Sequence, residues 1–108
     1  EADRTHFRWL VRVVNGDVGG LDDRISGALD NGWTVDRLGA LMRALLRAAA
    51  AELMARRDIP ARVVVSEYVE LAGAFFSRRE PAFVNAALDA MARRARAAEF
   101  AAPGNMNG

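Results

Sequence analysis

DIPARVVVSEYVELAGAFFSRREPAFVNAALD, residues Asp58–Asp89, predicts two helices joined by a short basic loop. Pro60 fits the first turn of the first helix and Pro81 that of the second, because an N–H at these positions has no partner within the helix. In both helices apolar residues recur every three or four positions, which is the spacing of a buried helix face. These residues are Val64, Tyr68, Leu71 and Phe75 in the first helix and Val84, Leu88, Met91 and Ala95 in the second. The stripe of the first helix is broad, because Val65, Val69, Ala72 and Phe76 run alongside.

The rest of the chain predicts three more helices. The first begins at Asp3 or Thr5 and has Phe7, Leu10, Val11 and Val14 on its apolar face; a short one follows from Val18 to Leu29; the third runs from about Val35 to Arg56. Trp33 precedes the third helix and is expected to pack on Leu38 as a hydrophobic staple. No alternating strand pattern is present, so the sequence predicts an all-α bundle of about five helices over residues 1–100 and a flexible tail at 101–108.

Composition limits the possible functions. The 108 residues carry 15 basic and 14 acidic side chains, a net charge of +1, and no cysteine. Disulfides, zinc thiolate sites and thiol catalysis are therefore excluded, and any contact with nucleic acid must be local. No apolar run reaches the roughly 18 residues of a membrane span, so a soluble, cytoplasmic protein is expected.

The sequence does not contain a recognisable catalytic or metal-binding arrangement. His6 is the only histidine, and the Glu67 and Glu70 pair has no second carboxylate pair opposite it. We therefore expect no enzyme activity, no metal and no cofactor, and we expect Glu67 to form an ion pair with Arg47. The arginines at 93, 94 and 96 are expected to be solvated and to compensate the dipole of the last helix.

A possible RNA site lies at the starts of the two helices quoted above. Arg62 opens the first helix, whereas Arg78, Arg79 and Phe83 open the second. Single-stranded RNA is bound by arginines at its phosphates and by aromatic rings at its bases. Antiparallel helices would separate Arg62 from the other three, and a strongly crossed pair would bring them together. A solvated basic loop is the alternative.

The chain resembles the NusB family of bacterial transcription antitermination factors. The resemblance is carried by DIPARVVVSEYVELA (Asp58–Ala72), FVNAALD (Phe83–Asp89), MRALLRAAAAEL (Met42–Leu53) and HFRWLV (His6–Val11). It implies a factor that binds boxA-type RNA together with the ribosomal protein NusE. The basic position after the DIP turn corresponds to Arg62, and the family's base-stacking phenylalanine corresponds to Phe83. Met42 occupies the position at which the family often has an acidic residue facing NusE.

The family also has an arginine-rich N-terminal helix that nothing in this chain matches. We therefore expect the chain to be a fragment, a cleaved product or a natural truncation, with the first two helices exposed and able to form a homodimer. Two further functions stay open. One is the RNA-binding appendage of a ribosomal RNA cytosine methyltransferase, and the other is a helical dimerisation scaffold that does not bind RNA.

Overall fold

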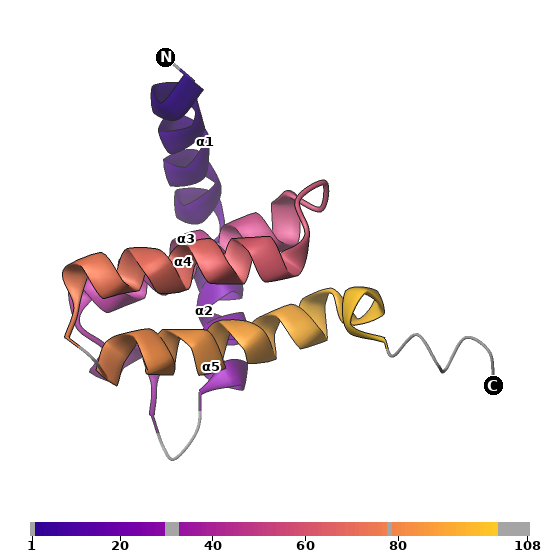
Figure 1. Cartoon of the computed structure of the whole chain (residues 1–108). Helices are drawn as coiled ribbons and strands as arrows, with labels where there is room; N and C mark the ends of the chain where they lie inside the picture. Colours follow the sequence, from indigo (N-terminus) through magenta and orange to yellow (C-terminus); the bar gives the residue numbers. More distant parts are fainter. Residues whose placement is uncertain (1, 30–32, 78, 102–108) are drawn as a thin grey trace.

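The computed structural model describes residues 2–29, 33–77 and 79–101, and within these ranges all of the regular secondary structure is helical, as predicted (Figure 1). The elements in chain order are α1 (Ala2–Gly16), α2 (Val18–Ala28), the 3₁₀ helix η1 (Val35–Arg37), α3 (Ala40–Ala55), α4 (Ala61–Phe75), α5 (Arg79–Ala95) and the 3₁₀ helix η2 (Ala97–Phe100). In the described part, none of these helices is long and apolar enough to span a membrane. Nearly all of the predicted tail lies outside the described residues.

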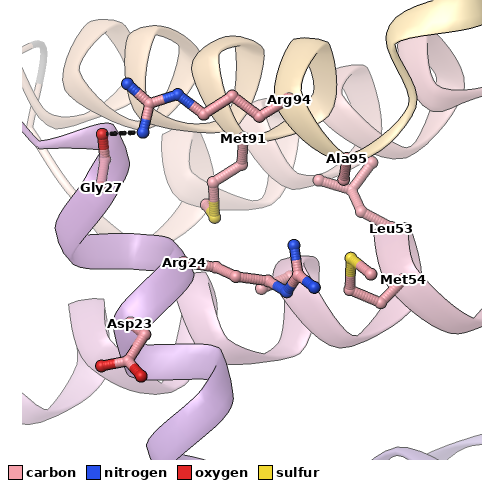
Figure 2. A pocket seen from close by; sticks show the side chains of 9 residues that line it. Asp23, Arg24, Gly27, Leu53, Met54, Met91, Arg94 and Ala95 are labelled. Atoms are coloured by element: carbon pink, nitrogen blue, oxygen red, sulfur yellow. Dashed lines mark hydrogen bonds between the residues drawn. The ribbon is translucent and has the colours of Figure 1, made fainter.

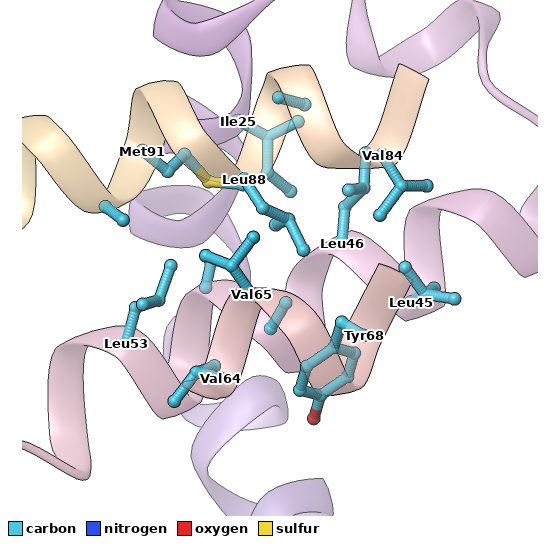
Figure 3. Close-up of a cluster of buried hydrophobic side chains, with 14 of the residues drawn as sticks. Ile25, Leu45, Leu46, Leu53, Val64, Val65, Tyr68, Val84, Leu88 and Met91 are labelled. Carbon is cyan, nitrogen blue, oxygen red and sulfur yellow. The ribbon is translucent and has the colours of Figure 1, made fainter. Parts of the chain in front are cut away.

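Helix α3 is the centre of the bundle and packs against the four other α-helices. Its buried residues include a run of three alanines, Ala49–Ala51, which lets neighbouring helices approach closely. Leu46 and Leu53 are completely enclosed on the same helix, and Figure 3 shows them facing side chains from α4 and α5. Burial of these apolar side chains is the main stabilising contribution to the fold.

The predicted apolar stripe is confirmed for α5, but only in part for α4. Val64 and Tyr68 are buried, whereas Leu71 and Phe75 are exposed and the small Ala72 is buried instead. On a 3.6-residue helix Leu71 lies about 60° to one side of Tyr68 and Ala72 about 40° to the other. The neighbouring helices cover the Ala72 side, so the prediction that Leu71 and Phe75 face the core was wrong.

The third predicted helix begins five residues later than expected, at Ala40. Val35 and Leu38 are both buried, and the chain reaches this arrangement through the short turn η1 followed by extended backbone at Leu38. The expected staple is therefore absent: Trp33 remains 45% exposed, and its ring is in contact with Phe83.

A buried guanidinium closes the turn between α3 and α4. Arg96, just after α5, is only 3% exposed. It donates hydrogen bonds to the carbonyl oxygens of Arg56 at 3.4 Å, Arg57 at 3.5 Å and Ile59. These carbonyls belong to the C-cap residue of α3 and to the turn that follows it, so Arg96 ties this turn to the end of α5. The expectation of a solvated arginine was wrong at this position.

Glu99 extends the same connection to the start of α4. One carboxylate oxygen accepts the backbone N–H of Ala61 at 2.8 Å, and the other accepts a hydrogen bond from Arg96. These bonds, the one from Ala61 first, lower the pKa of Glu99 below its ordinary value. The C-terminal segment thus satisfies groups on both sides of the turn between α3 and α4.

Arg47 binds a different carboxylate from the one predicted. Its guanidinium forms two parallel hydrogen bonds with Asp22 on α2, at 2.7 and 2.8 Å, and these lower the pKa of Asp22. Glu67, the expected partner, is exposed on α4. The predicted ion pair was wrong because α2, and not α4, lies beside this face of α3.

Helix α1 extends away from the bundle (Figure 1). Leu10 and Val14 are partly covered by the core, whereas Phe7 is 65% exposed and Val11, one turn further along, is also exposed. An exposed apolar pair on one helix face favours association. We therefore expect concentration-dependent dimerisation, which sedimentation velocity over a range of protein concentrations measures. Phe7→Asp should restore the monomer, and a wild-type chain that stays monomeric at high micromolar concentration would contradict this prediction.

Replacing Arg96 by methionine tests the connection made by its guanidinium. We expect the free energy of unfolding to fall by about 2–3 kcal/mol, because several backbone carbonyls lose a charged donor. Urea denaturation measures this change. Arg93→Met is the matched control: Arg93 forms an exposed pair with Asp89 at 2.8 Å, so its loss should cost less than about 1 kcal/mol. Equal losses in the two variants would contradict the role of Arg96.

Candidate nucleic-acid interface

A wide hollow lies between η1 and the first turns of α5, and we call it the aromatic groove. Its volume is about 550 Å³, within the roughly 300–1,000 Å³ of small-ligand sites. Helix α5 contributes Arg79 and Phe83, which lie on one face because they are four residues apart. The lining residues are Trp33, Arg37, Leu38, Gly39, Ala40, Leu41, Met42, Phe76, Arg79, Glu80 and Phe83.

Two aromatic rings and an arginine meet in this groove. The ring centroids of Trp33 and Phe83 are 6.1 Å apart and the planes are tilted by 60°. The guanidinium of Arg37 lies over the Trp33 ring, 5.2 Å from its centroid, in a cation–π contact. Phe83 is half-buried, so part of its ring remains available to a ligand, as its position at the edge of the α5 stripe predicted.

The rim of the groove carries both signs of charge. Arg79 is exposed, and beside it the Glu80 carboxylate accepts a hydrogen bond from the Ser77 hydroxyl at 2.6 Å. This bond lowers the pKa of Glu80, which is therefore ionised at neutral pH. Arg78, the remaining member of the predicted basic loop, lies outside the described residues.

Arg62 lies away from this groove. Its guanidinium is 4.7 Å from the centroid of the Phe100 ring, and Arg93 lies 4.8 Å from the same ring. Helices α4 and α5 run antiparallel, so the start of α4, which carries Arg62, lies beside the end of α5 (Figure 1). Phe83 lies near the opposite end of α5, in its first turns. Ten residues of helix, from Phe83 to Arg93, span about 15 Å. The structure therefore does not bring Arg62 together with Arg79 and Phe83.

A second hollow surrounds Arg62, and we call it the Phe100 hollow. Its volume is about 270 Å³, and its lining combines one cation with the polar side chains of two helices. The lining residues are Arg62, Val65, Ser66, Val69, Asn85, Asp89 and Phe100. The candidate surface thus has two parts along α5, each containing an arginine stacked on an aromatic ring.

Met42 lies in the wall of the aromatic groove and is only 7% exposed. Its neighbour Leu41 is exposed and lines the same groove. A partner could reach the Met42 side chain only by entering the groove. Its role as a partner contact stays a prediction.

The small cavity between α2, α3 and α5 is a structural feature and not a candidate site (Figure 2). Its volume is about 80 Å³, enough for a few water molecules only. At its edge Arg94 of α5 donates a hydrogen bond to the carbonyl oxygen of Gly27 in the last turn of α2. Arg94 therefore stabilises the C-terminus of α2 in two ways. It donates to a carbonyl that lies in the last turn of the helix, and it places a positive charge at the negative end of the helix dipole.

A polar chain links α1 to the core on the opposite side of α3. Tyr68 donates a hydrogen bond to the buried Glu52, whose other oxygen lies 3.5 Å from Nε2 of His6. Burial is the main reason that the pKa of Tyr68 is raised, and the bond to Glu52 adds to it. His6 also stacks on Trp9 at 5.5 Å. Among the described residues, no three His, Cys, Asp or Glu side chains are grouped as metal ligands would be.

Comparison with known proteins decides the family. The family model of NusB matches residues 1–93. The chain belongs to the NusB family. Its relatives include the transcription antitermination protein NusB of Nitrobacter hamburgensis, 51% identical over 100 residues, which make up 93% of this chain and 62% of that protein. The protein of the same name from Caulobacter vibrioides is 50% identical over 95 residues, with coverage of 88% and 64%.

The solved structure of T. maritima NusB confirms the NusB-like fold. It superimposes with a TM-score of 0.78 at 33% sequence identity, covering 86% of this chain and 66% of that one. The chain spans about three fifths of the length of the curated relatives it matches, from 57% to 64%.

Sequence reasoning did not identify Trp33 and Arg37 as site residues. Trp33 was assigned to a helix staple on the basis of the Thr34 cap that follows it, and Arg37 was placed inside the third helix. The only hint in the sequence was an aromatic residue, Trp33, just before the Thr34 cap. Its neighbour Phe83 is 50 positions later in the sequence, so local spacing could not reveal the pair.

Proposed function

We propose that this chain is a transcription antitermination factor that binds single-stranded boxA-type RNA together with the ribosomal protein NusE. The observation that carries this proposal is the half-buried Phe83 ring beside the exposed Arg79 in the aromatic groove. Its membership of the NusB family, whose curated relatives are named as antitermination proteins, supports the proposal. We expect no catalytic step, because RNA and protein binding alone suffice for this activity.

In this proposal an unpaired base stacks on Phe83 and Arg79 contacts the adjacent phosphate. Stacking requires an accessible ring face fixed by its surroundings, and Phe83 meets this requirement because part of it packs on the core. Arg62 would contact the strand at the Phe100 hollow, about 15 Å further along α5. One strand laid along α5 would then reach both parts of the surface. Arg78 is proposed to add to the positive charge at the first part.

The protein partner is proposed to approach the side of the aromatic groove formed by the start of α3. Leu41 is exposed there, and Met42 lies beneath it. An apolar residue at position 42 would favour an apolar contact with NusE, in place of the acidic contact of the family. Binding of NusE and of RNA would then involve neighbouring walls of one groove.

Titration with boxA RNA and with a scrambled RNA of equal length and composition tests the proposal. We expect tighter binding of boxA, with an affinity that falls as salt rises. Binding to ribosomal RNA without preference for boxA would favour the methyltransferase appendage. Absence of binding to any RNA, with dimerisation retained, would favour the scaffold and overturn the proposal.

Phe83→Ala tests the stacking role. We expect RNA binding to weaken by about 1–3 kcal/mol, the contribution of one base–aromatic stack. The half-buried ring should contribute about 1–2 kcal/mol to stability, less than the ~3–5 kcal/mol of a fully buried phenylalanine. Val84→Ala is the matched control, since Val84 is completely buried and should affect stability alone. A Phe83→Ala protein that is folded and binds RNA normally would exclude stacking on this ring.

Arg62→Ala and Arg79→Ala test the two phosphate contacts separately. A logarithmic plot of the binding constant against salt concentration has a slope of about −0.7 for each phosphate contact with a single strand. Each variant should therefore reduce the steepness of this plot by about 0.7, and the double variant by the sum. Arg24→Ala on α2, which lines neither part of the surface, should leave the slope unchanged. An unchanged slope for Arg79→Ala would remove that residue from the proposed interface.

A further inference from the structure

We propose that Trp33 is a second base-stacking platform, so that the aromatic groove takes two unpaired bases of one RNA strand. One base lies on Phe83 and the other replaces the Arg37 guanidinium on the Trp33 ring. This inference rests on the proposed RNA-binding function and adds to it a second element, the segment at η1. Nothing in the family resemblance stated above assigns a role to Trp33.

Trp33 is unusually exposed for a tryptophan that adjoins buried residues. Trp33 is 45% exposed, although the residues that follow it at Val35 and Leu38 are buried. The buried Val35 and Leu38 fix the backbone of η1 and so hold the indole at the mouth of the groove. Because the indole is largely exposed there, its own burial contributes little to the stability of the fold. An apolar ring that is held in place and accessible to solvent is the arrangement that base stacking uses.

The Trp33 ring already carries a planar group. The planar guanidinium of Arg37 lies over the indole at 5.2 Å, and Phe83 lies beside it at 6.1 Å. A nucleobase is also planar and overlaps a larger part of the indole, so it can replace the guanidinium on this ring. Arg37 does not form an ion pair with any described carboxylate, so the displaced guanidinium is free to bind a phosphate of the incoming strand.

The charge of the rim favours RNA over a peptide at this position. Two arginines, Arg37 and Arg79, and one carboxylate, Glu80, line the groove, so its charge is positive on balance. Arg37 lies over the Trp33 ring, and Arg79 precedes Phe83 by about one turn of α5. Alternating stacking faces and phosphate-binding cations match the alternating bases and phosphates of a single strand. An apolar peptide segment would leave both guanidiniums without a partner.

The experiment uses Trp33 as its own reporter. In a Trp9→Phe background Trp33 is the only tryptophan, and boxA-type RNA should quench its fluorescence as a base stacks on the indole. Trp33→Ala should weaken RNA binding about 5- to 150-fold, the loss expected for one stacked base, and Trp33→Phe should recover most of it. Arg37→Ala should weaken binding and make it less salt-dependent.

Trp9 provides a matched control. It is partly exposed and also has an arginine, Arg56, over its ring at 6.0 Å, but it lies on α1 outside the groove. Trp9→Ala should therefore leave RNA affinity unchanged. Melting curves of each variant establish that the compared proteins are folded, and the fluorescence measurement needs no substitution in the groove.

The outcomes separate this inference from the function on which it rests. If RNA binding is lost in Phe83→Ala but Trp33→Ala and Trp33 fluorescence are unaffected, the second platform is excluded and the proposed function stands. If the wild-type chain binds no RNA, the proposed function fails and this inference fails with it. If Trp33→Ala weakens the binding of ribosomal protein NusE but not of RNA, the groove is a protein-binding site and the inference is overturned.

Discussion

The buried guanidinium of Arg96 determines how α3, α4 and α5 are joined. Three carbonyl oxygens after the end of α3 accept its hydrogen bonds, and Glu99, which it also binds, accepts the first free N–H of α4. A cation therefore lies at the C-terminus of one helix and a carboxylate at the N-terminus of the next, which is the favourable charge at each dipole end. A lysine could not form this set of bonds, because it lacks the planar fork of donors.

This connection also determines the Phe100 hollow. Glu99 and Phe100 belong to η2, so the bonds that hold Glu99 against Ala61 also place the Phe100 ring beside Arg62. The aromatic groove has a different origin. There Val35 and Leu38 anchor η1 in the core, and Phe83 packs partly on the same core. Both parts of the surface are thus positioned by buried contacts, although the groups that would meet a ligand are accessible.

Helical periodicity was sufficient to predict the class of fold, the central position of α3 and the buried face of α5. It could not predict which side of the α4 stripe is covered, because Leu71 and Ala72 flank Tyr68 at similar angles and only the neighbouring helices decide between them. The partner of Arg47 was wrong for a similar reason, since Asp22 and Glu67 are both plausible until the position of α2 is known. Arg79 and Phe83 could be placed together because they are one helical turn apart. Arg62 and Trp33 could not be placed, because their ring neighbours, Phe100 and Phe83, are 38 and 50 positions away.

The chain has a net charge of only +1, and a shared arrangement of arginine and aromatic ring would allow it to bind the single-stranded RNA proposed above. Arg37 and Arg62 each lie on an aromatic ring, so part of the entropy of fixing a long side chain would already be lost before a strand binds. The guanidinium is more weakly hydrated than an ammonium group, which lowers the cost of moving it from a ring to a phosphate. Affinity in such a surface comes from a few ordered cations and exposed rings, whereas a uniformly basic surface would bind any nucleic acid. The low net charge therefore favours discrimination by stacking over binding by charge alone.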